Sequence, residues 1–137
     1  VMAGSDIVAL DATGRPRLDG LSFASTVAAL REDGTLVMAD CGSFEDAQRA
    51  ARSGVDIVST TLAGYTGDRV KTDGPDLELL AEVVAAFPDV PVICEGRVHT
   101  PEQAAAAIEA GAFAVIVGTA ITHPTSITTW FKAAVEG

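Results

Sequence analysis

Residues 91–111 read PVICEGRVHTPEQAAAAIEAG and contain one complete strand-and-helix unit. The unit opens with a short apolar run that ends at Glu95, as expected for a strand in a covered sheet. Thr100 and Gln103 then match a capping box, with proline at the first helical position. Gly111 stands where the helix should end, because glycine adopts the left-handed conformation without a side-chain clash. The stretch therefore predicts a β-strand followed by an α-helix.

The same kind of unit occurs five times along the chain. The predicted strands are nearly continuous in Val, Ile, Leu and Ala, which is typical of strands buried on both faces. They span residues 6–11, 36–40, 56–61, 91–95 and 113–118. The predicted amphipathic helices span residues 22–32, 44–52, 76–86, 101–110 and 126–135. This alternation predicts an α/β fold with a parallel sheet covered by helices.

One helix-to-strand junction is repeated in the sequence. Residues 4–8 read GSDIV, residues 54–58 read GVDIV, and residues 111–115 read GAFAV more loosely. Reuse of one junction favours a TIM (β/α)8 barrel, of which this chain supplies about five βα units. A doubly wound parallel sheet remains the alternative. No linker or change of composition divides the chain, so we expect a single domain.

The composition excludes several classes of protein. The 137 residues carry 9 basic and 19 acidic side chains, a formal net charge of -10. We therefore expect no nucleic acid and no membrane surface as partner. The hydrophobic fraction of 48% is too high for a disordered chain, and no apolar stretch is long enough to cross a bilayer. Cys41 and Cys94 lack metal-ligand spacing and no signal peptide is visible, so we expect no metal and a reducing, cytoplasmic location.

Polar residues end the predicted strands, and in a barrel the active site lies at these carboxyl ends. They are Asp11, Asp40, Thr60 with Thr61, Glu95, and Gly118 with Thr119. A single Asp or Thr is often only a cap, but three carboxylates at one end of a sheet repel one another. Their convergence therefore indicates polar contacts to a ligand rich in hydroxyls. Glu95 is the most specific candidate for moving protons, because it directly follows an apolar run; the alternative is an ion pair with Arg97.

Two further features adjoin these strand ends. Gly96, Gly118 and Thr119 follow the last two strands, where barrels often bind phosphate, and so predict a phosphorylated small molecule. Tyr65 lies in a long connection, residues 62–75, that is either a lid or a solvated loop. The aromatic residues expected to anchor a core or an interface are Trp130 and Phe131.

Several of these segments together resemble the bacterial N-acylmannosamine-6-phosphate 2-epimerase family. They read ALDAT at 9–13, MAD at 38–40, TTLAGYT at 60–66, EGRVHTPE at 95–102 and VGTAIT at 117–122. The resemblance covers essentially the whole chain. It implies a TIM-barrel isomerase of sialic acid catabolism that interconverts N-acetylmannosamine 6-phosphate and N-acetylglucosamine 6-phosphate without a cofactor. It also implies that residues 1–137 are the carboxyl-terminal part of a single barrel domain, with strands four to eight.

The resemblance assigns roles to the strand-end residues. Glu95 and Asp40 are predicted to be catalytic. The residues predicted to bind the sugar are Asp11, Thr61, Tyr65 and Arg97, and those predicted to bind its phosphate are Gly96, Gly118, Thr119 and His123. In the open-chain sugar the aldehyde acidifies the hydrogen on C2. A base removes that proton, and the enediolate-like intermediate is reprotonated on its other face.

Two departures from the family pattern have consequences. His123 stands where the family usually has arginine, and a neutral imidazole offers one donor in place of a charged fork. Phosphate binding is therefore expected to be weaker or dependent on pH. The family's catalytic lysine lies on an earlier strand, whereas Lys71 and Lys132, the only lysines of this sequence, do not end a predicted strand. The chain alone is therefore predicted not to epimerise at a normal rate.

Two other functions stay open at this point. A different phosphate-binding barrel, an isomerase or a synthase, would share the phosphate pattern, although it has no reason to combine Tyr65 with Glu95. A five-stranded part of a barrel also leaves two unpaired edges. The second alternative is therefore a non-catalytic module that pairs with a second copy as a homodimer, or with the amino-terminal part of a barrel.

Overall fold

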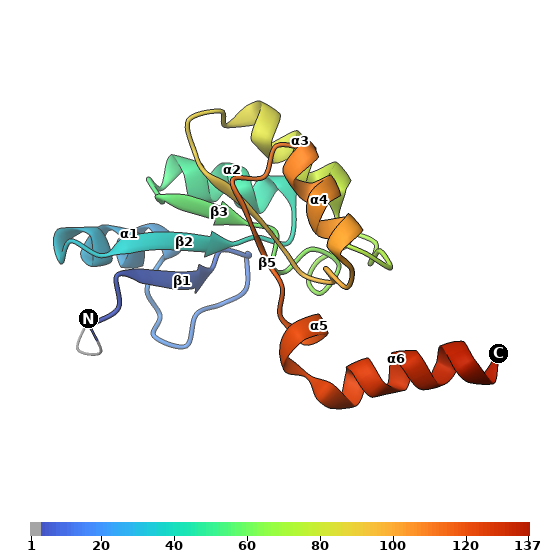
Figure 1. The fold of residues 1–137 in the computed structure, drawn as a ribbon. Coiled ribbons are helices and arrows are strands. Elements are labelled where there is room, and N and C mark those ends of the chain that lie inside the picture. Colours follow the sequence, from blue (N-terminus) through green and yellow to red (C-terminus); the bar gives the residue numbers. More distant parts are fainter. Residues whose placement is uncertain (1–3) are drawn as a thin grey trace.

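The computed structural model describes residues 4–137 and shows one open, parallel sheet (Figure 1). Its strands are β1 (Ile7–Asp11), β2 (Leu36–Asp40), β3 (Ile57–Ser59), β4 (Val92–Glu95) and β5 (Ala114–Ile116). The helices are α1 (Phe23–Glu32), α2 (Phe44–Arg52), α3 (Leu77–Ala86), α4 (Pro101–Glu109), α5 (Thr119–Thr122) and α6 (Pro124–Glu136). The strands pair in the order β1-β2-β3-β4-β5, which confirms the predicted alternation of strands and helices. A doubly wound sheet reverses its strand order, so this consecutive order favours the barrel.

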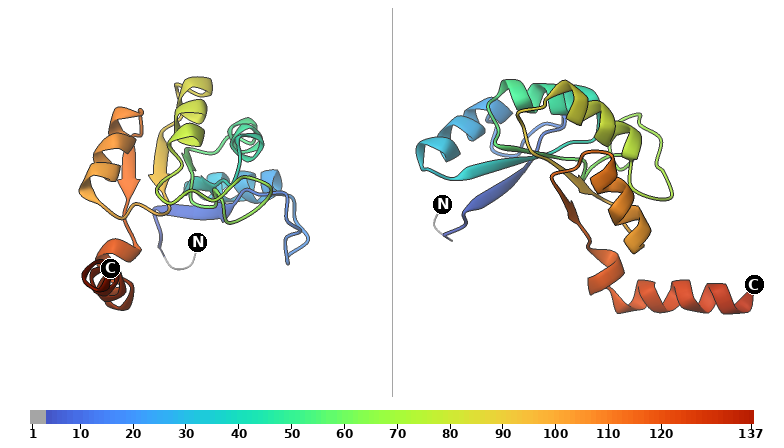
Figure 2. Two further views of the ribbon diagram at one scale, coloured as in Figure 1. Left: turned by 90° about the vertical axis from the view of Figure 1, so that its right-hand side faces the viewer. Right: turned by 45° about the horizontal axis from the view of Figure 1, so that its top comes forward.

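Helices α1 to α4 cover one face of the sheet (Figure 2). The core lies between that face and the helices. On the sheet side Val37, Val58 and Cys94 are fully buried, and on the helix side Val27 and Leu80 are fully buried. Removing these apolar side chains from water is the main favourable term in the stability of the fold.

The opposite face of the sheet is open within residues 4–137. Successive side chains of a strand point to opposite faces, and this face carries Ile7, Leu36 and Ile116, which are 46%, 46% and 37% exposed. The prediction that each strand is buried on both faces is therefore wrong for the described residues, because nothing among them covers this side. Strands β1 and β5 also each keep one edge without a partner strand in the described part of the chain.

The local signals around α4 form as predicted. The hydroxyl of Thr100 accepts a hydrogen bond from the backbone N–H of Gln103 at 3.2 Å, and the Gln103 side chain accepts one from the Thr100 N–H at 3.3 Å. This reciprocal pair is a capping box. After the helix, Gly111 has φ +99°, a conformation that side chains disfavour.

Two strands are shorter in the structure than the sequence predicts. Strand β3 ends at Ser59, because the carbonyl of Thr60 turns away from the sheet and accepts a hydrogen bond from the N–H of Ala63 at 3.0 Å. Strand β5 ends at Ile116, and the carbonyl of Gly118 accepts the first hydrogen bonds of α5. The polar residues at both ends therefore belong to turns that follow the sheet.

The end of the chain differs most from the prediction. The short helix α5 was not predicted, and α6 begins at Pro124, a residue suited to the first turn of a helix. Helix α6 extends away from the sheet (Figures 1 and 2), and none of its residues is buried. Trp130 and Phe131 are 38% and 71% exposed, so their predicted role in a core is wrong for residues 4–137. No helix in this part of the chain combines the length and apolar content needed to cross a bilayer.

Candidate active site

The strand register aligns the predicted carboxylates at one end of the sheet. Asp11 on β1 pairs with Asp40 on β2, and Asp40 pairs with Ser59 on β3. Glu95 ends β4. Because the strands are parallel, these carboxyl ends lie on the same edge, and alternation directs the side chains to the open face. The predicted convergence of polar strand ends is present in the structure.

One threonine joins two of these carboxylates. The Thr61 hydroxyl lies 2.8 Å from Glu95 Oε2 and 3.0 Å from Asp40 Oδ1. The Ser59 hydroxyl lies 2.7 Å from the Thr61 hydroxyl and 3.3 Å from Glu95 Oε2. Asp40, Ser59, Thr61 and Glu95 therefore form one connected set, which we call the strand-end network.

The strand-end network has four contacts but only two hydroxyl protons, those of Ser59 and Thr61. Thr61 carries one hydroxyl proton and can donate it to only one of its two carboxylate neighbours. If Thr61 donates to Glu95, the bond to Asp40 requires a proton on Asp40. Burial raises the pKa of Asp40; the Thr61 hydrogen bond opposes this, and the negative charges of Glu95 and Asp11 add to it. Asp40 is thus suited to hold a proton at a higher pH than an ordinary aspartate.

A second threonine fixes the backbone of Glu95. Thr60 is 2% exposed, and its hydroxyl donates to the Glu95 carbonyl at 3.0 Å and accepts from the Glu95 N–H at 3.1 Å. The Thr60 side chain therefore takes the place that its own carbonyl, which bonds Ala63, leaves empty in the sheet. This holds the Glu95 side chain in reach of the Thr61 hydroxyl.

Asp11 lies beside the network but has partners of its own. The backbone N–H and the hydroxyl of Thr13 donate to Asp11 Oδ1 at 2.8 and 2.6 Å, and Arg15 forms a 2.5 Å ion pair with Asp11 Oδ2. Partial burial alone would raise the pKa of Asp11, but the hydrogen bonds from Thr13 and Arg15 outweigh it and lower the pKa. The pKa values of Asp11 and Asp40 are therefore shifted in opposite directions, so Asp11 ionises at a lower pH than Asp40.

A cavity of about 240 Å3 adjoins the strand-end network. It brings together most of the residues predicted to bind sugar and phosphate. The lining includes Thr61, Tyr65, Glu95, Gly96, Arg97, Gly118 and Thr119. His123 does not line this cavity; its Nδ1 accepts a hydrogen bond from the N–H of Ser126 at 3.3 Å at the start of α6.

The alternative interpretation of Glu95 as an ion-pair partner of Arg97 is wrong. The Arg97 guanidinium donates to the carbonyls of Ala63 and Gly74 and to the hydroxyl of Thr72, all in the loop of residues 62–75. Glu95 instead bonds hydroxyls. The loop is therefore held against the site by Arg97 and is not a free solvated excursion.

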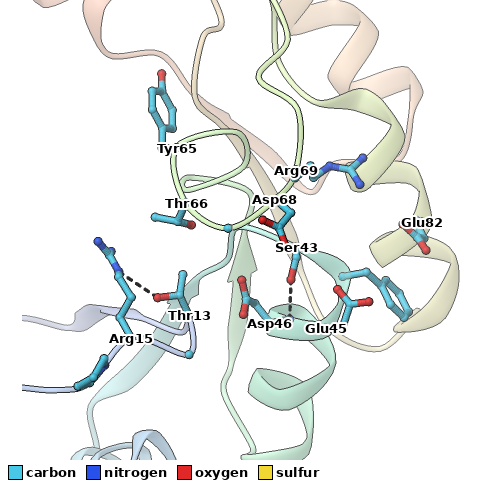
Figure 3. Close-up of a pocket in the computed structure, with 14 residues that line it drawn as sticks. Thr13, Arg15, Ser43, Glu45, Asp46, Tyr65, Thr66, Asp68, Arg69 and Glu82 are labelled. Carbon is cyan, nitrogen blue, oxygen red and sulfur yellow. Dashed lines mark hydrogen bonds between the residues drawn. The ribbon is translucent and has the colours of Figure 1, made fainter.

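A larger groove of about 940 Å3 lies next to the cavity, between loops that follow β1, β2 and β3 (Figure 3). Thr13, Arg15, Asp46 and Arg69 are among its lining residues, and Tyr65 lines both the groove and the smaller cavity. The basic groups here are already paired: Arg15 with Asp11, and Arg69 with Asp76 at 2.5 Å. At the start of α2 the groove is lined by Ser43, Phe44 and Glu45.

Neither lysine is placed to act as a base at the strand ends. Lys71 lies in the loop with its Nζ 5.2 Å from the centre of the Tyr65 ring. Lys132 lies on the exposed helix α6, 3.6 Å from Glu136. Within residues 4–137, no group of three or more His, Cys, Asp and Glu side chains is arranged to hold a metal ion.

Comparisons with known proteins identify the family. A family model described as "Putative N-acetylmannosamine-6-phosphate epimerase" (NanE) matches residues 1–137. A protein of Cutibacterium acnes named as an N-acetylmannosamine-6-phosphate 2-epimerase is 58% identical over 136 residues, which are 98% of this chain and 59% of the relative. A relative of the same name from Corynebacterium glutamicum is 48% identical over 131 residues, 96% of this chain and 56% of the relative.

A solved structure supports the same assignment. The N-acetylmannosamine-6-phosphate 2-epimerase from Clostridium perfringens superposes with a TM-score of 0.90 at 43% identity, over 94% of this chain and 56% of that one. The likeness confirms the α/β fold and is consistent with a TIM-barrel fragment. The chain spans a little over half the length of these relatives. Because the family model matches its full length, the chain belongs to the N-acetylmannosamine-6-phosphate epimerase family.

Proposed function

We propose that residues 1–137 form the carboxyl-terminal part of a single (β/α)8 barrel that interconverts N-acetylmannosamine 6-phosphate and N-acetylglucosamine 6-phosphate. The observation that carries the proposal is the strand-end network. It places two carboxylates, Asp40 and Glu95, on one hydroxyl of Thr61, beside a cavity at the carboxyl edge of the sheet. Inversion at C2 requires a proton to leave one face and another to reach the opposite face, and such a pair can hold and move protons.

Each member of the network has a distinct part in this mechanism. Asp40, whose pKa is raised by burial, can donate a proton to a substrate oxygen at a higher pH than an ordinary aspartate. Glu95 accepts hydrogen bonds from Thr61 and Ser59 and leaves a carboxylate oxygen for the substrate hydroxyls and the proton in transit. Such groups stabilise the charge of an enediolate because they are already oriented before it forms.

The base that first removes the C2 proton lies outside this set of residues in our proposal. The family resemblance assigns that step to a lysine, and neither Lys71 nor Lys132 ends a strand. We therefore place the base on a part of the barrel that residues 1–137 do not include. The carboxylates described here would then act on the substrate oxygens and on the return of the proton.

The substrate phosphate is proposed to lie beyond β4 and β5. Gly96, Gly118 and Thr119 line the small cavity, and Gly96 has no side chain that would keep a phosphate away from its backbone. Asp11 and Tyr65 border the site and are proposed to contact the sugar. His123 lies outside the lining, between α5 and α6, and its side chain is proposed to contact the phosphate from the edge of this site.

The open face and the free edges of β1 and β5 support a partner that completes the barrel. Ile7, Leu36 and Ile116 are exposed on that face, and in a closed barrel such side chains fill the interior. We propose that the amino-terminal part of the barrel occupies it, with a second copy of the chain as the other candidate. The buried, unbridged Cys41 and Cys94 agree with a reducing, cytoplasmic setting.

The proposal is tested by following conversion of N-acetylmannosamine 6-phosphate by NMR. The chain is joined behind the amino-terminal residues of the Cutibacterium acnes relative, so that a whole barrel is present. Glu95→Gln should lower kcat at least 100-fold, whereas the matched control Glu109→Gln, on an exposed helix face, should not change it. Equal activity of both variants would contradict the proposal, and conversion by residues 1–137 alone would contradict the placement of the base.

A further inference from the structure

We propose that Arg97 is a positioning residue that pins the loop of residues 62–75 and thereby holds Tyr65 beside the Glu95 cavity. The contacts of Arg97 fix the position of the loop, and only the identity of the ligand rests on the proposed function. Direct contact between Arg97 and the substrate is the competing role.

The backbone around Arg97 is turned to make these contacts. Arg97 has φ +56° and is the only non-glycine residue with positive φ among residues 4–137. It follows Gly96, which has φ +98°. Residues other than glycine adopt this region at a cost, and they keep it where the surrounding structure fixes them. Here the two left-handed residues directly follow β4 and direct the Arg97 side chain across to the loop.

The guanidinium ties both ends of the loop together. Its Nη1 donates to the carbonyl of Ala63 at 2.7 Å, near the start of the loop. Its Nε donates to the carbonyl of Gly74 at 3.1 Å, near the end, and its Nη2 donates to the hydroxyl of Thr72 at 3.0 Å. Thr72 itself donates to the Gly74 carbonyl at 2.7 Å. One side chain therefore closes a loop of more than ten residues, which a lysine with a single ammonium head cannot do in the same geometry.

The same guanidinium orients the aromatic ring. Arg97 Cζ lies 4.9 Å from the centre of the Tyr65 ring, and Lys71 Nζ lies 5.2 Å from it. Both distances are within the range of a cation–π contact. Tyr65 lines the small cavity that contains Glu95 and also the larger groove next to it. Arg97 thus fixes the orientation of the Tyr65 ring, which lines both the small cavity and the larger groove.

The contacts favour positioning over direct substrate binding. A guanidinium has five N–H groups, and each of the three nitrogens of Arg97 already donates to the loop. Three of the five N–H groups are thus committed to the loop, and only one N–H on each Nη is left for another acceptor. The loop contacts that hold Tyr65 in place therefore use most of the donors of this side chain.

The test uses two readouts that do not depend on activity. Trypsin cleaves after Lys71, inside the loop, and Tyr65 is the only tyrosine of the chain, so its ring NMR signals are unambiguous. Arg97→Lys should speed cleavage after Lys71 at least tenfold and shift the Tyr65 ring signals. The matched control Arg52→Lys, on an exposed helix position, should do neither.

A second variant covers the case in which Arg97→Lys unfolds the protein. Thr72→Val keeps Arg97 but removes one of its acceptors, and it should speed the same cleavage about threefold with a smaller shift of the Tyr65 signals. Unchanged cleavage and unchanged Tyr65 signals in both variants would overturn the proposal.

Inhibition by inorganic phosphate separates positioning from direct contact in the complete barrel. If Arg97 only positions the loop, Arg97→Lys should lower kcat with the sugar phosphate and change the inhibition constant of phosphate less than twofold. A tenfold weaker inhibition by phosphate would show direct contact and contradict the positioning role. If no form of the protein converts the sugar, the proposed function fails, while the cleavage and NMR results still decide the role of Arg97.

Discussion

Replacing Thr60 by valine tests how the protein holds Glu95 in place. Valine has nearly the same shape as threonine but lacks the hydroxyl that donates to the Glu95 carbonyl at 3.0 Å and accepts from the Glu95 N–H at 3.1 Å. The Thr60 side chain is 2% exposed, so water does not readily replace it. One backbone donor and one acceptor thus lose their partners.

The expected loss of stability follows from these two groups. Leaving a buried polar group without its hydrogen bond costs about 1 to 3 kcal/mol, so the two groups left by Thr60→Val should lower the free energy of unfolding by about 2 to 6 kcal/mol. A typical domain has about 5 to 15 kcal/mol in total. The loss should also release Glu95 from its 2.8 Å contact with the Thr61 hydroxyl and reduce kcat of the complete barrel.

Urea unfolding followed by circular dichroism measures this loss. Thr60→Ser keeps the hydroxyl and should recover most of the stability. Thr128→Val makes the same substitution at an exposed position of α6 and should stay within about 0.5 kcal/mol of the native protein. If Thr60→Val is as stable as the native protein, or Thr60→Ser is as unstable as Thr60→Val, the reasoning about Glu95 is refuted.

Three further perturbations follow from the structure. The pKa of Asp40 is raised in the folded state, so the native protein loses stability as the pH rises from the ordinary aspartate pKa through the raised value. Asp40→Asn removes this loss and should therefore become more stable relative to the native protein between pH 4 and pH 7, as measured by urea unfolding. A relative loss of stability over that range would contradict the raised pKa. His123→Arg should lower KM for the sugar phosphate in steady-state assays, because a guanidinium can donate two charged hydrogen bonds to the phosphate, although the variant loses the cap that His123 provides for α6. An unchanged KM would contradict the role of His123 in phosphate binding. Gly111→Ala should lower the free energy of unfolding by about 1 to 2 kcal/mol, because Gly111 has φ +99° and a Cβ there would lie 2.9 Å from Val84 Cγ1. A free energy of unfolding in urea equal to that of the native protein would contradict this prediction.

The sequence was sufficient where the cause is local. The apolar run before Glu95 and the Thr100 and Gln103 pair depend only on neighbouring residues, and both formed as predicted. Glu95 and Thr61 could be named as site residues because each follows an apolar run near the end of a strand. Their contact depends on the strand order, which the repeated unit already favoured.

The sequence was insufficient where the cause lies in distant contacts. Ser59 was missed because it looks like part of an apolar strand, although it lies two residues before Thr61 and so faces the same side. The role of Thr60 depends on a carbonyl that turns toward the following loop. The partners of Arg97 lie more than 20 residues earlier, and no periodicity signals them.

Exposure was mispredicted for a different reason. The strands are apolar enough to be buried on both sides, but within residues 4–137 only one side is covered by helices. Trp130 on α6 is a large aromatic residue of the kind that anchors a core. Within residues 4–137, however, its only aromatic contact is with the His99 ring, at 4.7 Å between ring centres. Apolar side chains indicate that burial is favourable, but they do not show which residues bury them.

Deuterium incorporation at C2 of N-acetylmannosamine 6-phosphate tests the central claim most directly. The assay is run in heavy water with the barrel completed by the amino-terminal residues of the Cutibacterium acnes relative, and the C2 signal is followed by proton NMR. We predict rapid exchange with Glu95 and Asp40 in place, loss of at least 100-fold in rate with Glu95→Gln, and no exchange by residues 1–137 alone. Exchange at the native rate in Glu95→Gln would contradict the claim that the strand-end network stabilises the enediolate that forms when the C2 proton leaves.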